Sequence, residues 1–130
     1  MSFFLERSAI AAIVRYEPTR EAIQELIVAA SSYVIPVHCR LELTLAFSLK
    51  ERRLDVLREV VENGACETVG LPASAAPLLE ETALRYGKGS GHPAQLNFGD
   101  CMSYAVAKSL RLPLLFVGDN FSLTDVEAAV

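Results

Sequence analysis

The feature that most constrains the fold is a helix signal followed at once by a short apolar run, over residues 97–119. Asn97 is a favourable N-cap residue, and Asp100 follows at the spacing of a capping box. The run Leu-Pro-Leu-Leu-Phe-Val at 112–117 predicts a strand buried on both faces, as in parallel sheets. Apolar residues at steps of three and four predict one buried helix face: Phe98, Cys101, Met102, Ala105, Val106 and Leu110.

The rest of the chain alternates strand and helix patterns in the same way. Strands are expected over 3–5, 33–37 and 67–71, and helices over 9–15, 19–30, 38–50, 53–62 and 72–86. Pro36 must lie at the end of its strand or on an edge, because proline has no N–H to donate. No repeat or linker interrupts the pattern. We therefore expect one α/β domain over residues 1–130, a sandwich with a mainly parallel central sheet flanked by helices.

Two of the expected helices carry apolar stripes. The helix over 19–30 has Ala22, Ile23, Leu26, Ile27 and Ala30 on one face, and the helix over 38–50 has Leu41, Leu45 and Leu49. The segment 87–96 that follows the helix over 72–86 is a glycine-rich loop without the spacing of a phosphate-binding P-loop.

Composition excludes several classes of protein. The hydrophobic content of 52% excludes a disordered chain, and no apolar run of about 18 residues is present to span a membrane. We see no export signal and expect a cytoplasmic protein. The net charge of −4, from 12 basic and 16 acidic residues, argues against a broad nucleic-acid-binding surface. A small acidic pocket that meets a phosphodiester through a metal ion is compatible with that charge.

The cysteines and histidines indicate no metal site. Cys39, Cys66 and Cys101 are far apart and are expected to be reduced core residues. His38 and His92 are not at the usual ligand spacing from them, so a zinc site is not expected.

Four acidic residues fall where strand ends and helix starts should converge: Glu6, Glu42, Asp100 and Asp119. Each also has an ordinary explanation, because Asp100 suits the first turn of a helix and Asp119 suits a turn beside Gly118. Glu42 either faces solvent beside the apolar stripe or points inward as a functional acid. Ligand crevices of open α/β sheets lie outside the carboxyl ends of the strands, where such residues would meet.

These positions occur within longer stretches that resemble a known family. The segments RYGKGSGHPAQLNFGDCMSYAVAK at 85–108 and GDNFSLTD at 118–125 are similar to PIN-domain ribonucleases of the VapC toxin type. The resemblance covers nearly the whole chain. It implies an endoribonuclease that depends on Mg²⁺ or Mn²⁺ and is held inactive by a VapB-like antitoxin encoded alongside, and it implies a homodimer. Hard divalent ions prefer carboxylate oxygens, which agrees with this picture.

The resemblance assigns roles to individual residues. Glu6, Glu42, Asp100 and Asp119 become the catalytic acids, and Glu6, Asp100 and Asp119 become the metal ligands. Ser8, Lys88 and His92 are weaker candidates for RNA contacts, and Arg7 and Arg40 are further candidate cations. The antitoxin segment is expected to cross the apolar faces of residues 19–30 and 38–50 and to direct an arginine at the carboxylates.

The first acidic motif departs from the family pattern. Such proteins have an aspartate, a small residue and then Ser or Asn, commonly DTSA or DASA, whereas this chain has Glu6-Arg7-Ser8-Ala9. Glu6 keeps the charge but is longer by one methylene, and Mg²⁺ demands near-ideal geometry. Arg7 adds a permanent cation that can pair with a site carboxylate and compete with the metal.

Two alternatives to an active ribonuclease follow. One is a PIN-fold protein with weakened catalysis that acts mainly by binding an antitoxin or another partner. The other is an unrelated small α/β binding module.

Overall fold

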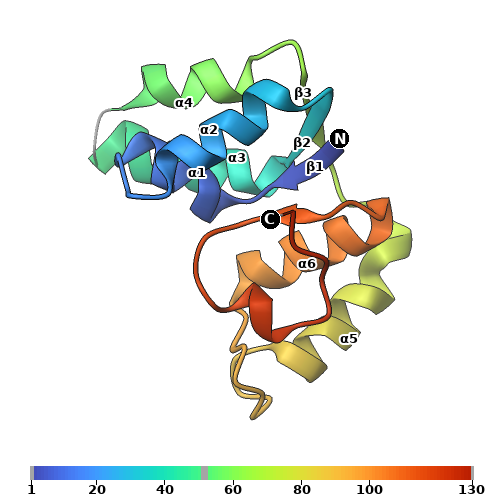
Figure 1. The fold of residues 1–130 in the computed structure, drawn as a ribbon. Helices are drawn as coiled ribbons and strands as arrows, with labels where there is room; N and C mark the ends of the chain where they lie inside the picture. The colour runs from blue at the N-terminus through green and yellow to red at the C-terminus, as the bar shows by residue number, and fades with distance from the viewer. Residues whose placement is uncertain (1, 51–52, 130) are drawn as a thin grey trace.

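Four short parallel strands form the centre of the fold (Figure 1). The structure, a computed structural model, describes residues 2–50 and 53–129. The strands are β1 (Ser2–Leu5), β2 (Ser32–Pro36), β3 (Cys66–Val69) and β4 (Leu114–Leu115), in the spatial order β3-β2-β1-β4. The predicted parallel sheet is confirmed, and Pro36 is the last residue of its strand.

Helices cover both faces of this sheet. They are α1 (Arg7–Val14), α2 (Arg20–Ala29), α3 (Val37–Thr44), α4 (Leu54–Val61), α5 (Ala76–Tyr86) and α6 (Phe98–Leu110). A π-helical segment, Leu45–Lys50, continues α3, and 3₁₀ turns span Ala73–Ala75 and Phe121–Leu123. Figure 1 shows α1 to α4 on one side of the sheet and α5 and α6 on the other. No helix of the described residues has the length and apolar character needed to cross a membrane.

The central strand β1 is buried on both faces, and its side chains alternate between two hydrophobic cores. Phe3 and Leu5 pack with the helices α1 to α4. Phe4 packs on the opposite side, with residues of α5 and α6 such as Tyr86 and Tyr104. This alternation follows from the two-residue period of a strand. It fixes the end of β1, and therefore Glu6, at the junction of the two halves.

The predicted apolar face of α3 is exposed and does not pack in the core. Leu41 and Leu45 are 61% and 51% exposed, and Leu49 lies outside the residues whose side chains the structure describes. The buried side chains of this segment are instead Cys39, Leu43 and Phe47. Both sets repeat every four residues, so periodicity alone does not choose between the two faces. Contacts of α3 with α1, α4 and α6 make the choice.

The apolar face of α2 packs as a core face. Ile23 is buried, and Leu26, Ile27 and Ala30 are partly buried against the core beneath α1 to α4. Ala22, also predicted on this face, is exposed. Most of the stripe is therefore occupied by the chain itself, which argues against a partner groove on this face of α2.

The predicted face of α6 is only partly correct. Cys101, Ala105 and Val106 are buried as expected, but Phe98 is 85% exposed and Leu110 is 43% exposed. The buried face also includes polar side chains: Asp100, Ser103 and Tyr104. Because α6 contacts both α3 and α5, its buried arc is wider than one apolar stripe.

Candidate active site

Glu6 links the end of β1 to the start of α1. It is the N-cap residue of α1, is only 2% exposed, and accepts hydrogen bonds at Oε2 from the Ser8 N–H (2.7 Å) and from the Ser8 hydroxyl. Burial raises the pKa of Glu6 above its ordinary value, against the hydrogen bonds from Ser8 and the charge of Arg7, and Asp100 raises it further. A buried carboxyl group beside a second acid favours a cation at this place.

The Ser8 hydroxyl also joins two strand ends. Its oxygen accepts a hydrogen bond from the Val117 N–H at 2.9 Å, and the Leu115 carbonyl accepts one from the Glu6 N–H at 3.0 Å. The predicted strand over 112–117 therefore ends early, because the Val117 amide bonds to a side chain in place of the sheet. Ser8, a weak candidate for RNA contact, lies where it holds Glu6 against the segment after β4.

Asp100 is in the first turn of α6 and completes the predicted capping box. Its N–H donates to Asn97 Oδ1 at 2.8 Å, and its Oδ2 accepts the Asn97 N–H at 3.1 Å. The carboxylate is buried, and its other oxygen, Oδ1, lies 4.0 Å from Arg7 Nη2. One oxygen thus fixes the helix start while the other faces the site.

Glu42 reaches the start of α6 from α3, so it points inward and not into open solvent. Gly99 makes this approach possible, because a Cβ atom at position 99 would lie 2.8 Å and 3.0 Å from the two Glu42 carboxylate oxygens. Burial raises the pKa of Glu42, Arg7 lowers it, and Asp100 raises it. The N-terminal end of a helix stabilises a carboxylate placed there.

Asp119 follows β4 and lies at the rim. Gly118 before it has φ +103°, a left-handed conformation that glycine adopts without strain. The Asp119 side chain is exposed. It lines a cavity of about 190 Å³ that we call the carboxylate pocket. The lining residues of this pocket are Glu6, Arg7, Ser8, Asp100, Val117, Gly118, Asp119, Asn120 and Phe121.

Arg7 lies between the carboxylate pocket and Glu42. Its Nη1 is 3.4 Å from Glu42 Oε2, and its Nη2 is 4.0 Å from Asp100 Oδ1. Arg7 also lines a neighbouring cavity of about 330 Å³ between α1 and α3, here called the α1–α3 groove, with Glu42, Arg15 and Phe47 among its other lining residues. The structure thus brings Glu6, Asp100 and Asp119 into one pocket and places Glu42 next to it, across the Arg7 guanidinium.

The residues of the carboxylate pocket fit a hard divalent cation. Their charged donors are carboxylate oxygens, which Mg²⁺ and Mn²⁺ prefer. The position of the Arg7 guanidinium shows independently that a positive charge is accommodated at these acids. Glu6, Asp100 and Asp119 would hold the ion, with Glu42 close by.

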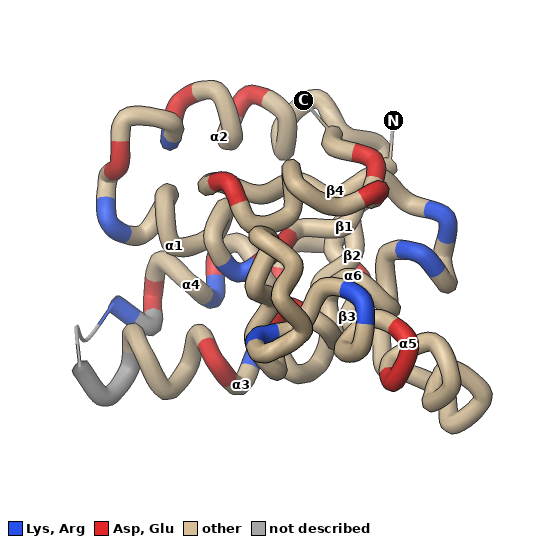
Figure 2. Tube along the Cα trace, turned by 90° about the horizontal axis from the view of Figure 1, so that it is seen from below, with Lys and Arg blue, Asp and Glu red and all other residues tan. Residues whose placement is uncertain are grey.

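The other predicted cations lie away from the pocket. His92 accepts the Ala94 N–H at Nδ1 (3.0 Å), and its ring packs edge-on against Tyr86 at 4.8 Å. Lys88 lines a separate apolar groove between α5 and α6. Arg40 donates to Thr68 Oγ1 of β3 at 2.9 Å. Figure 2 shows basic and acidic positions interspersed along the trace, so the basic residues are not gathered on a single element of the described chain.

With this geometry established, similarity to known proteins can be considered. The sequence model of the PIN domain matches residues 3–127. This chain belongs to the PIN-domain family. Within the family it is similar to Ribonuclease VapC42 of Mycobacterium tuberculosis, with 31% identity over 127 residues that cover 96% of this chain and 97% of the relative. It is also similar to Ribonuclease VapC of Mycolicibacterium smegmatis, with 33% identity over 129 residues, 95% of this chain and 97% of the relative.

Solved structures support the same fold. The PIN domain superimposes on a chain of the Rickettsia felis VapBC2 complex bound to a promoter DNA fragment with a TM-score of 0.75, at 14% identity, covering 98% of this chain and 96% of the other. It superimposes on VapC20 of Mycobacterium tuberculosis, a toxin that cleaves the sarcin-ricin loop, with a TM-score of 0.74 at 15% identity, covering 95% of each chain.

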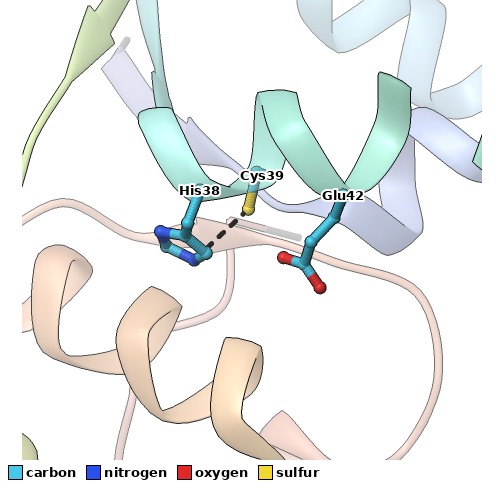
Figure 3. Close-up of side chains that lie close together, drawn as sticks. All are labelled: His38, Cys39 and Glu42. Carbon is cyan, nitrogen blue, oxygen red and sulfur yellow. Dashed lines mark hydrogen bonds between the residues drawn. The ribbon is translucent and has the colours of Figure 1, made fainter. Parts of the chain in front are cut away.

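This PIN domain also contains a cluster that the sequence reasoning missed. His38, Cys39 and Glu42 of α3 bring an imidazole nitrogen, a thiol sulfur and a carboxylate oxygen within 4.8 Å of one another (Figure 3). The expectation of no ligand arrangement among cysteines and histidines overlooked this group, because the usual spacing rules compare residues separated along the chain. Adjacent residues followed by an acid three positions later are the only signal in the sequence.

Proposed function

We propose that this protein is a VapC-type toxin, an endoribonuclease that cleaves RNA with Mg²⁺ or Mn²⁺ and is inhibited by a VapB-like antitoxin. The observation that carries the proposal is the meeting of Glu6, Asp100 and Asp119 in one pocket, with Glu42 beside it. Relatives of nearly equal length are named as ribonucleases, which favours an enzyme over a protein that acts only by binding a partner. The expected place of action is the cytoplasm.

The chain's own residues supply a defined part of this chemistry. A bound divalent ion lowers the pKa of a water molecule and stabilises the negative charge that develops at the phosphodiester. Glu6, Asp100 and Asp119 would hold the ion, and Glu42 would orient water beside it from the side of α3. Asn97 fixes Asp100 through the capping box, and Ser8 fixes Glu6. No serine or cysteine nucleophile is required.

Contacts to the RNA strand outside the pocket belong to the same proposal. Arg7 and Arg15 line the α1–α3 groove, and Arg7 is also beside the carboxylates of Glu42 and Asp100. Lys88 would meet RNA only where a strand extends to the groove between α5 and α6. Phosphate contacts of this kind give binding that weakens as salt rises.

Cleavage of a mixed RNA pool tests the catalytic proposal. The purified chain should cleave the pool with Mg²⁺ or Mn²⁺ and not after chelation, and Asp119→Asn should reduce the rate by at least about tenfold. Glu127→Gln, which removes an exposed acid outside the pocket, is the matched control. Cleavage that persists equally in Asp119→Asn and in chelator would contradict the proposal.

The partner part of the proposal rests on α3. Leu41 and Leu45 are exposed, and Glu42 lies between them in sequence and opens to the α1–α3 groove. An antitoxin segment that places apolar side chains on these leucines would bring a basic residue to the carboxylates. We also infer that the toxin is a homodimer.

Co-expression with the neighbouring open reading frame tests the partner. Native mass spectrometry should detect a complex with a small protein, and Leu41→Asp combined with Leu45→Asp should weaken it by at least about tenfold. Val28→Asp, at an 85% exposed apolar position on α2, is the matched control. Detection of homo-oligomers alone would count against a toxin–antitoxin pair.

A further inference from the structure

A second group of metal-type donors lies on one turn of α3, on the side that faces α6 (Figure 3). His38 Nε2 and Cys39 Sγ are 3.6 Å apart, and a carboxylate oxygen of Glu42 completes a set whose members lie within 4.8 Å of one another. Unlike the carboxylate pocket, this set contains sulfur and nitrogen. Such donors select borderline and soft ions over Mg²⁺.

The spacing of these donors matches tetrahedral zinc. Zinc bonds of about 2.0–2.1 Å to nitrogen and about 2.3 Å to sulfur place the two donors about 3.5 Å apart at the tetrahedral angle. The observed separation of His38 Nε2 and Cys39 Sγ is 3.6 Å. The hydroxyl of Ser103, on α6, lies 3.0 Å from that nitrogen and 3.5 Å from that sulfur. It therefore closes the site from the facing helix.

The histidine is held in a state that can bind metal. Its ring hydrogen-bonds the Gly99 backbone, which holds the ring in its orientation toward Cys39 and Ser103. Metal-binding histidines commonly use a backbone contact of this kind to fix the ring. The Cys39 thiol is fully buried and protonated before binding, and its proton passes to solvent when the sulfur–metal bond forms.

We propose that His38, Cys39 and Glu42 form a Zn²⁺ site separate from the carboxylate pocket, and that Zn²⁺ bound there draws Glu42 away from Arg7. The Glu42 side chain is 30% exposed, so one donor of the set is within reach of an ion in solvent. Zinc binding does not depend on RNA cleavage. Its expected consequence, inhibition of Mg²⁺-dependent cleavage through loss of Glu42, rests on the proposed function.

Cobalt substitution tests the site by spectroscopy. The metal-free full chain titrated with Co²⁺ should develop thiolate-to-cobalt charge-transfer absorption that saturates at one ion per chain, and Zn²⁺ should remove it. Cys39→Ser should abolish this absorption, and His38→Gln should weaken Co²⁺ binding by at least roughly tenfold. Cys66→Ser is the matched control, since Cys66 is a half-buried free thiol of β3.

The outcomes separate the two proposals. Absence of the thiolate absorption in the native chain, or its retention in Cys39→Ser, would overturn the zinc site. Circular dichroism establishes whether each variant is folded. If Cys39→Ser does not fold, loss of Co²⁺ binding in His38→Gln tests the zinc site, because His38 is only half-buried. Zinc inhibition of cleavage in the native chain but not in His38→Gln supports the link through Glu42, and equal inhibition overturns it. A chain that binds Co²⁺ through Cys39 and cleaves no RNA contradicts only the ribonuclease.

Discussion

The guanidinium of Arg7 lies 3.4 Å from the carboxylate of Glu42, beside the pocket that contains three further acids. The Arg7 side chain is 40% exposed, so solvent screens the ion pair and the guanidinium can leave without unfolding α1. A positive charge from the chain therefore lies next to the proposed place of the metal ion. Arg7 and the metal ion are therefore expected to compete for the carboxylates of the site.

Replacing Arg7 should strengthen metal binding. Arg7→Thr removes the competing cation, so Mn²⁺ should bind more tightly by calorimetry. In combination with Glu6→Asp, cleavage should rise by at least about tenfold, or about 1.4 kcal/mol of transition-state stabilisation. Arg58→Thr, on α4 and outside the pocket, controls for loss of positive charge. Unchanged Mn²⁺ affinity in Arg7→Thr would show that the ion pair does not compete.

Shortening Glu6 should change the preference between metals. The Glu6 side chain is fixed by Ser8 and is longer by one methylene than an aspartate at this position would be. Because Mg²⁺ demands near-ideal octahedral geometry, Mn²⁺ should support faster cleavage in the native chain. Glu6→Asp still provides a good N-cap for α1 and should bring the Mn²⁺ and Mg²⁺ rates closer together. If the ratio of the Mn²⁺ rate to the Mg²⁺ rate is equal in the native chain and in Glu6→Asp, then Glu6 serves as well as aspartate.

Asp100 should be separable into a helix cap and a metal ligand. Asp100→Asn keeps an oxygen that can accept the Asn97 N–H, so the free energy of unfolding should change little while cleavage falls at least about hundredfold. Asn97→Ala should do the opposite, with a loss of about 1 kcal/mol of stability and cleavage retained. It removes the side-chain oxygen that accepts the Asp100 N–H but keeps the backbone N–H that fixes the Asp100 carboxylate. Urea unfolding measures the stability of each variant, and single-turnover rates measure its cleavage activity. Equal losses of activity in the two variants would mean that Asp100 acts only through the helix start.

A methyl group at position 99 should move Glu42. The added Cβ would meet the Glu42 oxygens at 2.8 Å and 3.0 Å, and the flexible glutamate can turn away. Alanine also favours a helix over glycine by up to about 1 kcal/mol. Gly99→Ala should therefore keep or raise the melting temperature while lowering the cleavage rate. Gly64→Ala, where a Cβ meets nothing within 4 Å, is the control.

Asp125 should make stability depend on pH. The Tyr104 hydroxyl, and then Lys108, hold the pKa of Asp125 below its ordinary value against the effect of burial. The unfolded chain therefore binds more protons between the folded pKa and the ordinary value of about 3.9. This stabilisation is complete above that value and is lost as the pH falls through the folded pKa. Tyr104→Phe should lose about 1 kcal/mol near neutral pH and little in strong acid.

The control for the Asp125 prediction is Tyr33, whose hydroxyl bonds to a neutral partner. The Tyr33 hydroxyl donates to the Val60 carbonyl at 2.8 Å, so Tyr33→Phe should lose a similar amount of stability at every pH. Urea unfolding curves over the acid range compare the two variants. Parallel losses at all pH values would show that Asp125 is not the titrating group.

The sequence predicts strands and helix starts well where a local chemical reason exists. Asn97 and Asp100 form their capping box, and Pro36 ends its strand, because each depends on backbone groups a few residues away. The position of Glu6 at the end of β1 and of Asp119 after β4 follows from the parallel sheet. These features are sufficient to anticipate three acids at one edge.

Orientation of side chains about a helix was harder to predict. The four-residue period of Leu41 and Leu45 equals that of Cys39 and Leu43, so only packing against other helices decides which pair is buried. The same packing turns Glu42 inward, and the glycine that permits it is on another helix. Closeness in sequence can also mislead. His92 is near the site motifs in sequence, but its ring nitrogen accepts a hydrogen bond within its own loop.

The bond from the Val117 amide to Ser8 joins residues 109 positions apart, at the edge strand of the sheet. That strand has two residues, and on its inner side only β1 pairs with it. Leu114 also bridges to Ala128 on the outer side, and both residues of β4 are buried in the hydrophobic cores. The exposed residues 118–120 that follow lack such anchors, and exposed segments of this kind open at lower free energy than the core. Loss of the bond between Val117 and Ser8 would carry the rim at Asp119 away from Glu6 while both hydrophobic cores remained largely intact. Heating should therefore abolish cleavage through a local opening, at temperatures where the remainder of the molecule is still native.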